Sequence, residues 1–279
     1  MTVINTNIKA LRTQEAMQVN DRSLSAAMAQ LSSGKRINTA ADDAAGLAIS
    51  TRMTSQIRGL DQAVRNAGDA VSLLQTTEGA TQAITDMLQR MRELSIQSRN
   101  DTNSDTERSY LNLEFAQLQA EITRITENTT WNNFNVLDGT AGTSGTLFFQ
   151  IGVSSGQTVS IDLPDFNGTS VAGYVTASTV AISTSTGANA AMALIDTALD
   201  NINRQRATMG AVMNRLTYAM DNLSNISTST QQSRSRIQDA DYAKASSDLA
   251  RAQIIQQAAT AVLAQANTSQ QSVLKLLNG

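Results

Sequence analysis

Apolar residues recur along most of the chain at alternating steps of three and four positions, which is the spacing of a coiled-coil helix. The repeat forms four clear runs: Leu60, Val64, Ala67, Val71 and Leu74; Leu111, Phe115, Leu118, Ile122 and Ile125; Ile195, Leu199, Ile202, Met209, Met213, Leu216, Met220 and Leu223; and Ala252, Ile255, Ala259, Val262, Ala266, Val273 and Leu276. Only Arg206 is out of character within the third run. Before residue 32 the repeat is looser and changes phase after Leu11, as at a stutter. The pattern predicts long helices that pack through narrow apolar seams.

Turn-forming residues divide these helices. Gly34 in "LSSGKRIN" and the polar segment 100–109 predict breaks. Ser104 followed by Glu107 fits a capping box for the next helix. We therefore expect roughly four helical stretches in the N-terminal half and almost continuous helix from about residue 190 onward.

The middle of the chain has a different period. The segment "GTLFFQIGVSSGQTVSIDLP" alternates at period two on both sides of "SSGQ", which predicts a hairpin of strands 147–153 and 158–163 that ends at Pro164. The Ser/Thr-rich segment 175–189 fits a short strand plus a linker. The predicted fold is mainly α, with long antiparallel helices in a coiled-coil bundle and a small β-hairpin insert, about 147–163, where the chain turns back.

Composition excludes several classes of function. The chain has 279 residues with no Cys and no His, which removes disulfides, thiolate nucleophiles and His-based catalysis. The net charge of −3 argues against nucleic-acid binding. The N-terminus lacks the pattern of a Sec signal peptide, and no stretch of 18 apolar residues is present, so we expect no membrane span. We expect no cofactor and no enzymatic activity.

Isolated motifs have structural explanations. Asp42 and Asp43 are adjacent, so on a helix they diverge and cannot form a catalytic dyad; an acid pair near a helix start explains them better. The segment "DADYA" at 239–243 lacks the Gly and Glu of a calcium loop, so no metal site is predicted. Met209, Met213 and Met220 at seam spacing fit a bundle core better than an adaptable groove.

Both ends of the chain carry long and specific sequence strings. The opening carries "VINTNIKAL", "LSSGKRINTAADDAAGLAISTRM", "IRGLDQAVRNAGDAVSLLQTTEGA" and "LQRMRELSIQS". The end carries "SRIQDADYAKASSDLARAQIIQQAATAVLAQANTSQQSVLKLL". These strings resemble bacterial flagellin, and the resemblance covers about residues 1–140 and 190–279. Only residues 165–187 separate the hairpin from the returning helix, so this is a short form without the large outer domains of longer relatives.

The resemblance implies a structural subunit of the flagellar filament. Such a subunit is exported unfolded through the type III channel, polymerises under a cap and serves swimming motility outside the cell. Residues 1–44 plus 238–279 would form the inner coiled-coil layer, disordered in the monomer. Residues 45–237 would form a helical rod with the hairpin and a short variable linker, 165–187. The implied partners are further copies of the chain and the export chaperone, cap and junction proteins of the flagellum.

The terminal helices carry more apolar surface than one coil can bury. A two-helix coil buries one face of each helix and leaves the flanking faces in contact with water. The isolated ends are therefore marginally stable and become ordered when several subunits contribute contacts. A heterologous contact that does not close a ring propagates as a helical filament. We expect the assembly contacts to be Ile4, Ile8, Leu11, Ile255, Val262, Leu263, Val273, Leu274 and Leu277.

Two further sets of residues follow from the resemblance and the composition. The positions that match the family's cluster for the vertebrate Toll-like flagellin receptor are Arg90, Leu94 and Glu114, which we expect to face that receptor. Taken alone, Arg90 and Glu114 are a surface pair that is worth little, and the same face can pack against the next subunit. Exposed hydroxyls that permit O-glycosylation are Ser178, Thr179, Ser183, Thr184, Ser185 and Thr186.

Two alternatives remain from the sequence. A flagellar hook–filament junction protein shares the design with helical ends, but it would be scarce in sheared surface protein. A soluble coiled-coil adaptor or adhesin would bind through the Ser/Thr-rich middle and form a discrete oligomer rather than a polymer.

Overall fold

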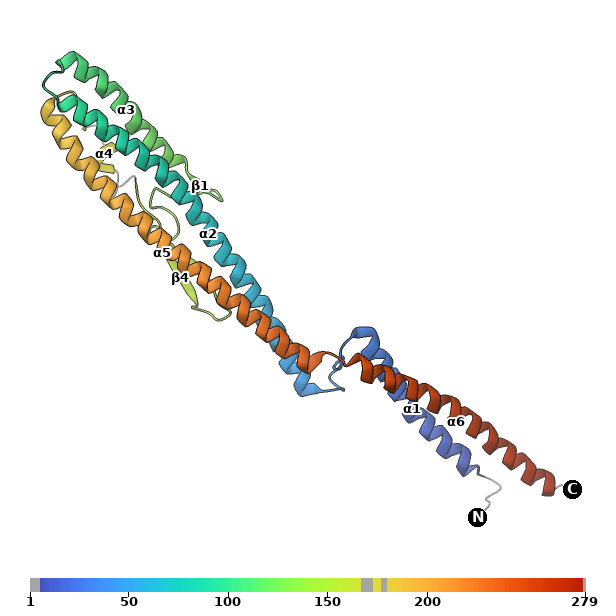
Figure 1. Cartoon of the computed structure of the whole chain (residues 1–279). Helices are drawn as coiled ribbons and strands as arrows, with labels where there is room; N and C mark the ends of the chain where they lie inside the picture. The colour runs from blue at the N-terminus through green and yellow to red at the C-terminus, as the bar shows by residue number, and fades with distance from the viewer. Residues whose placement is uncertain (1–5, 167–172, 177–179, 278–279) are drawn as a thin grey trace. The chain divides into compact units, whose positions relative to one another are not determined.

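The computed structural model describes residues 6–166, 173–176 and 180–277, with backbone alone for 173–174 and 270–277. The chain is mainly α, as predicted (Figure 1). The elements are α1 (Ile8–Ser33), α2 (Ala44–Arg99), α3 (Asp105–Asn128), β1 (Thr130–Trp131), β2 (Phe134–Asn135), β3 (Thr146–Gln150), β4 (Thr158–Asp162), α4 (Gly173–Thr176), α5 (Ser185–Gln238) and α6 (Tyr242–Leu277).

The chain divides into two compact units. Unit 1 comprises residues 1–57 and 228–279, and unit 2 comprises residues 58–227. Helices α2 and α5 each continue from one unit into the other. The sequence predicted domain boundaries near residues 44 and 238, where α2 begins and α5 ends, whereas the two units divide after residues 57 and 227.

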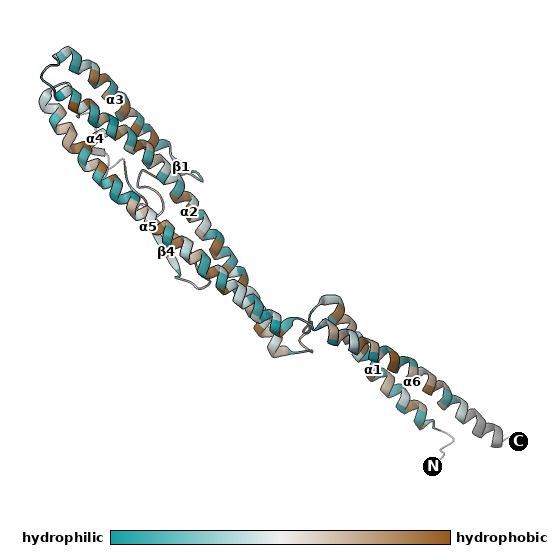
Figure 2. Ribbon diagram, viewed as in Figure 1, coloured by the Kyte–Doolittle hydropathy of each residue, from teal (hydrophilic) through white to brown (hydrophobic). Residues whose placement is uncertain are grey.

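The core of unit 2 is built from the predicted heptad runs. Along α5 the buried residues Ile195, Ile202, Met209, Leu216 and Leu223 alternate with half-buried members of the same run. Helices α2 and α3 face them with buried side chains that include Leu74, Leu88, Met91, Phe115 and Ile122. Figure 2 shows hydrophobic and hydrophilic residues interspersed along the long helices. Met209 belongs to this core and Met213 and Met220 pack against it, as predicted.

The helix ends follow the predicted local signals in two places. Gly34 terminates α1 in the left-handed region with φ of 69°. Ser104 and Glu107 form a reciprocal capping box at the start of α3. The expectation of roughly four helical stretches in the N-terminal half was wrong, because α2 runs unbroken from Ala44 to Arg99 and leaves three helices there. Tertiary packing along its apolar stripe stabilises this long helix despite the glycines within it.

The predicted hairpin is confirmed with slightly shorter strands. Strands β3 and β4 are antiparallel and pair Leu147 with Ile161. Two contacts hold the hairpin on α2 within unit 2. Asn66 Nδ2 donates a hydrogen bond to the Gln150 carbonyl at 2.9 Å. At Gly59 an added Cβ would lie 3.0 Å from Val153 Cγ1, so the missing side chain permits this close approach.

The expectation of a short strand within 175–189 was wrong for the described residues. Residues 173–176 form the single turn α4, and α5 already begins at Ser185. Polar side chains of α3 bind the intervening backbone: Gln119 Nε2 donates to the carbonyls of Val175 and Val180 at 2.7 and 3.1 Å. These contacts satisfy backbone groups that a strand would pair with a neighbour.

A second small hairpin has no counterpart in the sequence predictions. Strands β1 and β2 pair Trp131 with Phe134 across Asn132 and Asn133. Both asparagines have positive φ, of 45° and 67°, as a type I′ turn requires. The "NN" dipeptide is the signal that could have predicted it.

Candidate assembly surfaces

Helices α1 and α6 pair along their length within unit 1. Asn20 Nδ2 donates to the Ala252 carbonyl at 2.8 Å, and Asn7 Nδ2 donates to the Ala266 carbonyl at 3.2 Å. The order of these two pairs shows that the helices are antiparallel. Each asparagine side chain inserts toward the partner helix at a small residue and fixes the register by a directional hydrogen bond.

Small side chains make up the seam of this coil. Among the side chains that the structure describes in α1 and α6, the buried ones are Asn20, Ala27, Ala245, Ala252 and Ala266, each less than 9% exposed. The spacing of seven between Ala245 and Ala252, and of fourteen between Ala252 and Ala266, places the alanines on one heptad position. Alanine buries little area, so the seam supplies little hydrophobic stabilisation.

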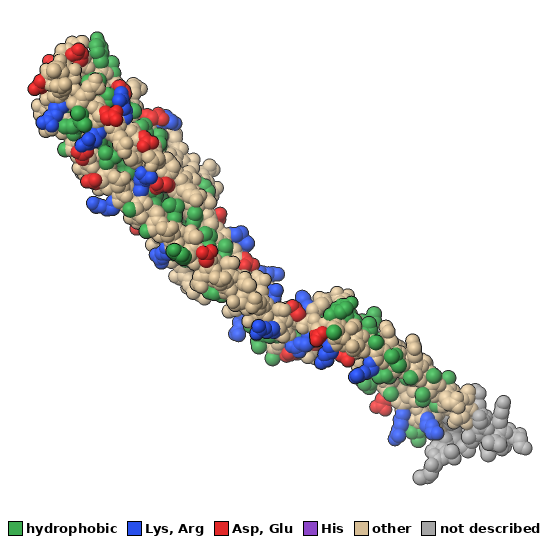
Figure 3. All heavy atoms as spheres, in the orientation of Figure 1, with side chains coloured by type: hydrophobic (Ala, Val, Ile, Leu, Met, Phe, Trp, Pro, Cys, Tyr) green, Lys and Arg blue, Asp and Glu red, His purple; other side chains and the backbone are tan. Residues whose placement is uncertain are grey.

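Many large apolar side chains of the same two helices are exposed, whereas Met17, Leu24, Leu31, Leu249 and Leu263 are half-buried. The exposed ones, apart from Tyr242, are Ile8 (49%), Leu11 (55%), Val19 (51%), Met28 (56%), Ile254 (66%), Ile255 (45%) and Val262 (55%). Apolar groups are visible over this coil in Figure 3. A coil with alanine inside and isoleucine, leucine and valine outside presents apolar surface for further partners.

Four of the five predicted assembly residues whose side chains are described lie on these exposed faces. Ile8, Leu11, Ile255 and Val262 are exposed, and Leu263 is half-buried. Ile4 lies outside the described residues, and only the backbone is described at Val273, Leu274 and Leu277. Val19, Met28 and Ile254, which the sequence prediction did not name, lie on the same helices and are exposed to a similar degree.

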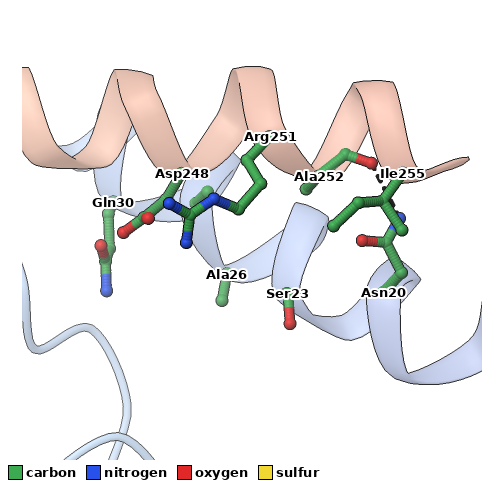
Figure 4. A pocket seen from close by; sticks show the side chains of 9 residues that line it. Asn20, Ser23, Ala26, Gln30, Asp248, Arg251, Ala252 and Ile255 are labelled. Carbon is green, nitrogen blue, oxygen red and sulfur yellow. Dashed lines mark hydrogen bonds between the residues drawn. The ribbon is translucent and has the colours of Figure 1, made fainter. Parts of the chain in front are cut away.

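A polar groove of about 400 Å³ interrupts the apolar surface between α1 and α6. Its lining includes Asn20, Ser23 and Gln30 of α1 and Asp248 and Arg251 of α6, and Figure 4 shows Asn20 next to Ala252 and Ile255. The dashed line in that view is the bond from Asn20 to Ala252. Hydrogen-bonding groups at this position favour one alignment of helices over a slide along the apolar surface.

The two acids at the start of α2 organise the segment that joins α1 to α2. Asp42 Oδ2 accepts hydrogen bonds from the backbone N–H groups of Asn38 and Thr39, at 3.0 and 2.8 Å, which lower the pKa of this carboxyl. Asp43 Oδ1 accepts from Gly46 N at 2.8 Å. Both acids therefore hold a turn and a helix start, in line with their structural interpretation.

The expected receptor cluster is only partly at the surface. Arg90 Nε donates to Glu114 Oε1 at 2.9 Å, which joins α2 to α3, and a second bond of 2.9 Å reaches Glu93. These bonds, first that to Glu114, raise the pKa of Arg90. Both partners are about half exposed. Leu94, however, is 0% exposed and belongs to the bundle core, so the expectation that it faces outward was wrong.

The expected glycosylation sites divide in the same way. Ser183, Thr184 and Thr186 are exposed, and Ser185 is half-buried. The Thr184 hydroxyl accepts a hydrogen bond from Gly187 N at 3.0 Å at the start of α5, so a glycan there would compete with a helix cap. Ser178 and Thr179 lie outside the described residues.

In the described part of the chain, the acidic side chains form no cluster of three that could hold a metal ion. None of its helices is long and apolar enough to cross a bilayer.

Comparisons with known proteins agree with this geometry. Residues 4–142 match the model of the bacterial flagellin N-terminal helical region, and residues 192–277 match that of the C-terminal helical region. The chain is 43% identical to a flagellin of Halalkalibacterium halodurans and 39% identical to flagellin FlaB1 of Treponema pallidum, over 99% of each pair of chains. A crystal structure of Bacillus cereus flagellin, 33% identical, superposes with a TM-score of 0.51 over 57% of this chain and 88% of that one.

Proposed function

Because this chain belongs to the bacterial flagellin family, we propose that its filament contacts are the exposed apolar faces of α1 and α6. The chain is a structural subunit of the extracellular flagellar filament and not an enzyme. The relatives named above have nearly its full length, so the short middle segment is shared with other flagellins.

The observation that carries the proposal is the inverted coil, with alanine in its seam and large apolar side chains outside. In a filament, Ile8, Leu11, Ile255 and Val262 would be buried by the same helices of neighbouring copies. At about 25 cal/mol per Å², even partial burial of several such side chains contributes several kcal/mol per subunit. That gain offsets the ordering entropy of the ends, so residues 1–44 and 238–279 would order on assembly and not before.

Negative-stain electron microscopy of the purified chain tests this proposal. The full chain, concentrated with a precipitant, should form long filaments, and deletion of 260–279 should abolish them. The double variant Ile255→Ser/Val262→Ser should raise the critical concentration for assembly by about a hundredfold or more, since two large apolar contacts are lost. The control Gln253→Ser changes an exposed polar residue of the same helix and should assemble normally. Normal filaments from the 260–279 deletion would contradict the proposal.

Flagellar partners would use the same faces. A chaperone that covers residues 256–279 before export would prevent premature polymerisation through the exposed apolar face of α6. Cap and junction proteins would contact the same face at the filament ends. Secretion of an assembly-defective Ile255→Ser chain in a flagellated host separates these roles. Normal export without filaments would show that Ile255 is needed for polymerisation but not for chaperone binding. Loss of both export and filaments would show that Ile255 is needed already for chaperone binding.

A second role concerns the surface pair Arg90–Glu114. This pair bridges α2 and α3 beside other exposed polar groups, and we propose that the Toll-like flagellin receptor reads it on the monomer, with buried Leu94 supporting Arg90 from below. In a receptor reporter assay, Arg90→Ala should lower activity. Arg92→Ala is the matched control, because Arg92 is equally exposed and forms a similar ion pair with Asp196, at 2.6 Å. Equal effects of the two variants would remove the proposal.

A further inference from the structure

The loop that joins β2 to β3 contains Asp138 and Gly139, the one Asp–Gly step in the sequence. At such a step the main-chain nitrogen of the glycine can attack the side-chain carboxyl of the aspartate and close a five-membered ring. Glycine favours this reaction, because it has no Cβ to shield its nitrogen or to limit rotation of its backbone. The loop therefore contains the aspartyl peptide bond of the chain that is chemically least durable.

The fold requires both residues of this step. Gly139 has a positive φ of 70°, and an added Cβ would lie 2.9 Å from the Cβ of Asp165, so a residue with a side chain does not fit there. The Asp138 carboxylate accepts hydrogen bonds that shape the loop. Replacement of either residue would disturb the loop, so durability has to come from the surroundings of the step.

Asn135 and Thr140 hold the Asp138 carboxylate from two sides, and we call these two residues the carboxylate clamp. Thr140 donates to Asp138 Oδ1 from its backbone N–H, at 3.0 Å, and from its hydroxyl, at 2.7 Å. Asn135 Nδ2 donates to Oδ2 at 3.0 Å. Burial alone would raise the pKa of this carboxyl, but the hydrogen bonds outweigh it and lower the pKa. The clamp keeps the group ionised and fixed in direction, whereas ring closure needs a neutral carboxyl that turns toward the next nitrogen.

The main chain is anchored on both sides of the step. Leu137 is 0% exposed, and its carbonyl accepts a hydrogen bond from Phe166 N at 2.8 Å. Beyond the step, Ala141 is 3% exposed. Ring closure rotates the peptide unit between Asp138 and Gly139, which would pull on both anchors. In the folded chain the reaction therefore requires a local opening of the loop first.

We propose that Asp138 is a site of isoaspartate formation and that the carboxylate clamp suppresses the reaction in the folded chain. When the loop opens, the Gly139 nitrogen bonds to Asp138 Cγ, a Cγ–O bond breaks, and the oxygen leaves with two protons as water. Water then adds to one of the two carbonyl carbons of the ring. Addition at Cγ restores aspartate, whereas addition at the main-chain carbonyl carbon leaves the chain running through the side chain as isoaspartate.

Isoaspartate would damage the core of unit 2. It lengthens the main chain by one carbon between the anchored residues Leu137 and Ala141. The hydrogen bond from Phe166 to Leu137 and the antiparallel bridge between Asp138 and Asp165 would then lose their alignment. Phe166 is 1% exposed, so its displacement would open the core. The clamp therefore sets the chemical lifetime of the folded unit, and this inference does not depend on the assembly contacts of α1 and α6.

Incubation of the full chain in neutral buffer tests the inference. Isoaspartate is counted by labelling with isoaspartyl methyltransferase and located by electron-transfer fragmentation of peptides. The fragmentation separates Asp138 from the Asn–Gly steps at 167–168 and 278–279, which lie outside the described residues. The chain unfolded in urea should accumulate isoaspartate at Asp138, and the folded chain should form it about a hundredfold more slowly.

Variants of the clamp give the decisive readout. In the folded chain, Thr140→Val should raise the rate about tenfold, because it removes one hydrogen bond to a charged group, and Thr140→Ser should restore the low rate. Asn135→Ala loosens the clamp from the other side and replaces Thr140→Val if that change lowers the urea midpoint of the whole chain. Thr143→Val is the matched control, since Thr143 is exposed in the same loop and pairs with Thr146 through its backbone.

Three results would overturn the inference. One is an equal rate in a clamp variant and in Thr143→Val, which would show that the clamp does not protect the step. Another is an equal rate in the folded and the urea-unfolded chain, which would show that the fold does not protect it. The third is the absence of isoaspartate at Asp138 in urea, which would show that the step is not reactive. None of these results bears on filament formation.

Discussion

Asn20 Nδ2 lies 2.8 Å from the carbonyl oxygen of Ala252, and this hydrogen bond is buried between the two terminal helices. It joins positions 232 residues apart in the sequence. The small, uniform alanine side chains around this bond fit together in more than one register. The hydrogen bond therefore sets which turn of α1 faces which turn of α6.

Replacement of Asn20 should therefore weaken assembled filaments. Asn20→Ala removes the donor and leaves the Ala252 carbonyl bonded only within its helix, at a cost of about 1 kcal/mol per subunit. The heat-depolymerisation temperature of filaments should fall. Ser23→Ala, an exposed change one turn away on the same groove, should leave it unchanged. If the two variants depolymerise at the same temperature, Asn20 does not set the register.

Arg206, the one charged residue in the heptad run of α5, forms a half-buried ion pair with Glu78 of α2 at 2.7 Å. Arg206→Ala should destabilise the monomer by about 1–3 kcal/mol, since it leaves the Glu78 carboxylate in the seam without its cation. The double variant Arg206→Met/Glu78→Met should recover most of this loss because it replaces the pair with apolar volume. Urea unfolding followed by circular dichroism measures both.

The control for the Arg206 experiment is Arg65→Ala. Arg65 is exposed, and its hydrogen bonds among the described residues go to the side chain of Gln62. It should shift the urea midpoint little. If the double Met variant is as unstable as Arg206→Ala, the loss does not come from the unpaired Glu78 carboxylate, and the ion pair itself stabilises the fold.

Two glycines of α2 should respond in opposite directions to the same substitution. At Gly46 an added Cβ would lie 2.5 Å from Asp43 Oδ2 and 2.6 Å from Ile37 Cδ1, so Gly46→Ala should cost about 1–3 kcal/mol. At Gly79 nothing lies within 4 Å, so Gly79→Ala should stabilise the helix by about 0.5–1 kcal/mol. Depolymerisation temperatures of filaments should fall for the first and hold or rise for the second; a shift of the same sign in both would be the contrary result.

Stability should not change between about pH 6 and 8, because the chain has no His. In the capping box of α3, hydrogen bonds from the backbone and hydroxyl of Ser104 lower the pKa of Glu107. A carboxyl with a lowered folded pKa stabilises the fold above its unfolded pKa and loses that contribution as the pH falls through the folded value. The unfolding temperature should thus decline only below about pH 4. Glu107→Gln should reduce that decline, and a transition near pH 6.5 would contradict the account.

Methionine oxidation should report which surface the polymer covers. Met28 is 56% exposed on α1, whereas Met91 is 0% exposed in unit 2. In the monomer, peroxide should convert Met28 to the sulfoxide much faster than Met91. In filaments, Met28 should become protected and Met91 should not change, as measured by mass spectrometry of peptides. Equal oxidation of Met28 in monomer and filament would place it outside the contact.

The sequence predicted the helical fold, the capping box and the β3–β4 hairpin, because each depends on local periodicity or on residues a few positions apart. It did not predict the β1–β2 hairpin, although the "NN" turn offered a signal. It gave 175–189 a strand, since it could not show that Gln119 of α3 would bind that backbone. The family resemblance, and not the local pattern, placed Leu94 in a receptor-facing cluster with Arg90, whereas Leu94 is 0% exposed in the structure.

The sequence by itself determined that this chain forms long helices with heptad seams and that its ends carry more apolar surface than one coil can bury, because both follow from periodicity and composition. Only the tertiary structure decided which stripe of each terminal helix faces its partner. It placed alanines in the seam and left Ile8, Leu11, Ile255 and Val262 exposed. The side-chain amides of Asn7 and Asn20 donate hydrogen bonds to backbone carbonyls across the coil, and no spacing along the sequence reveals these contacts.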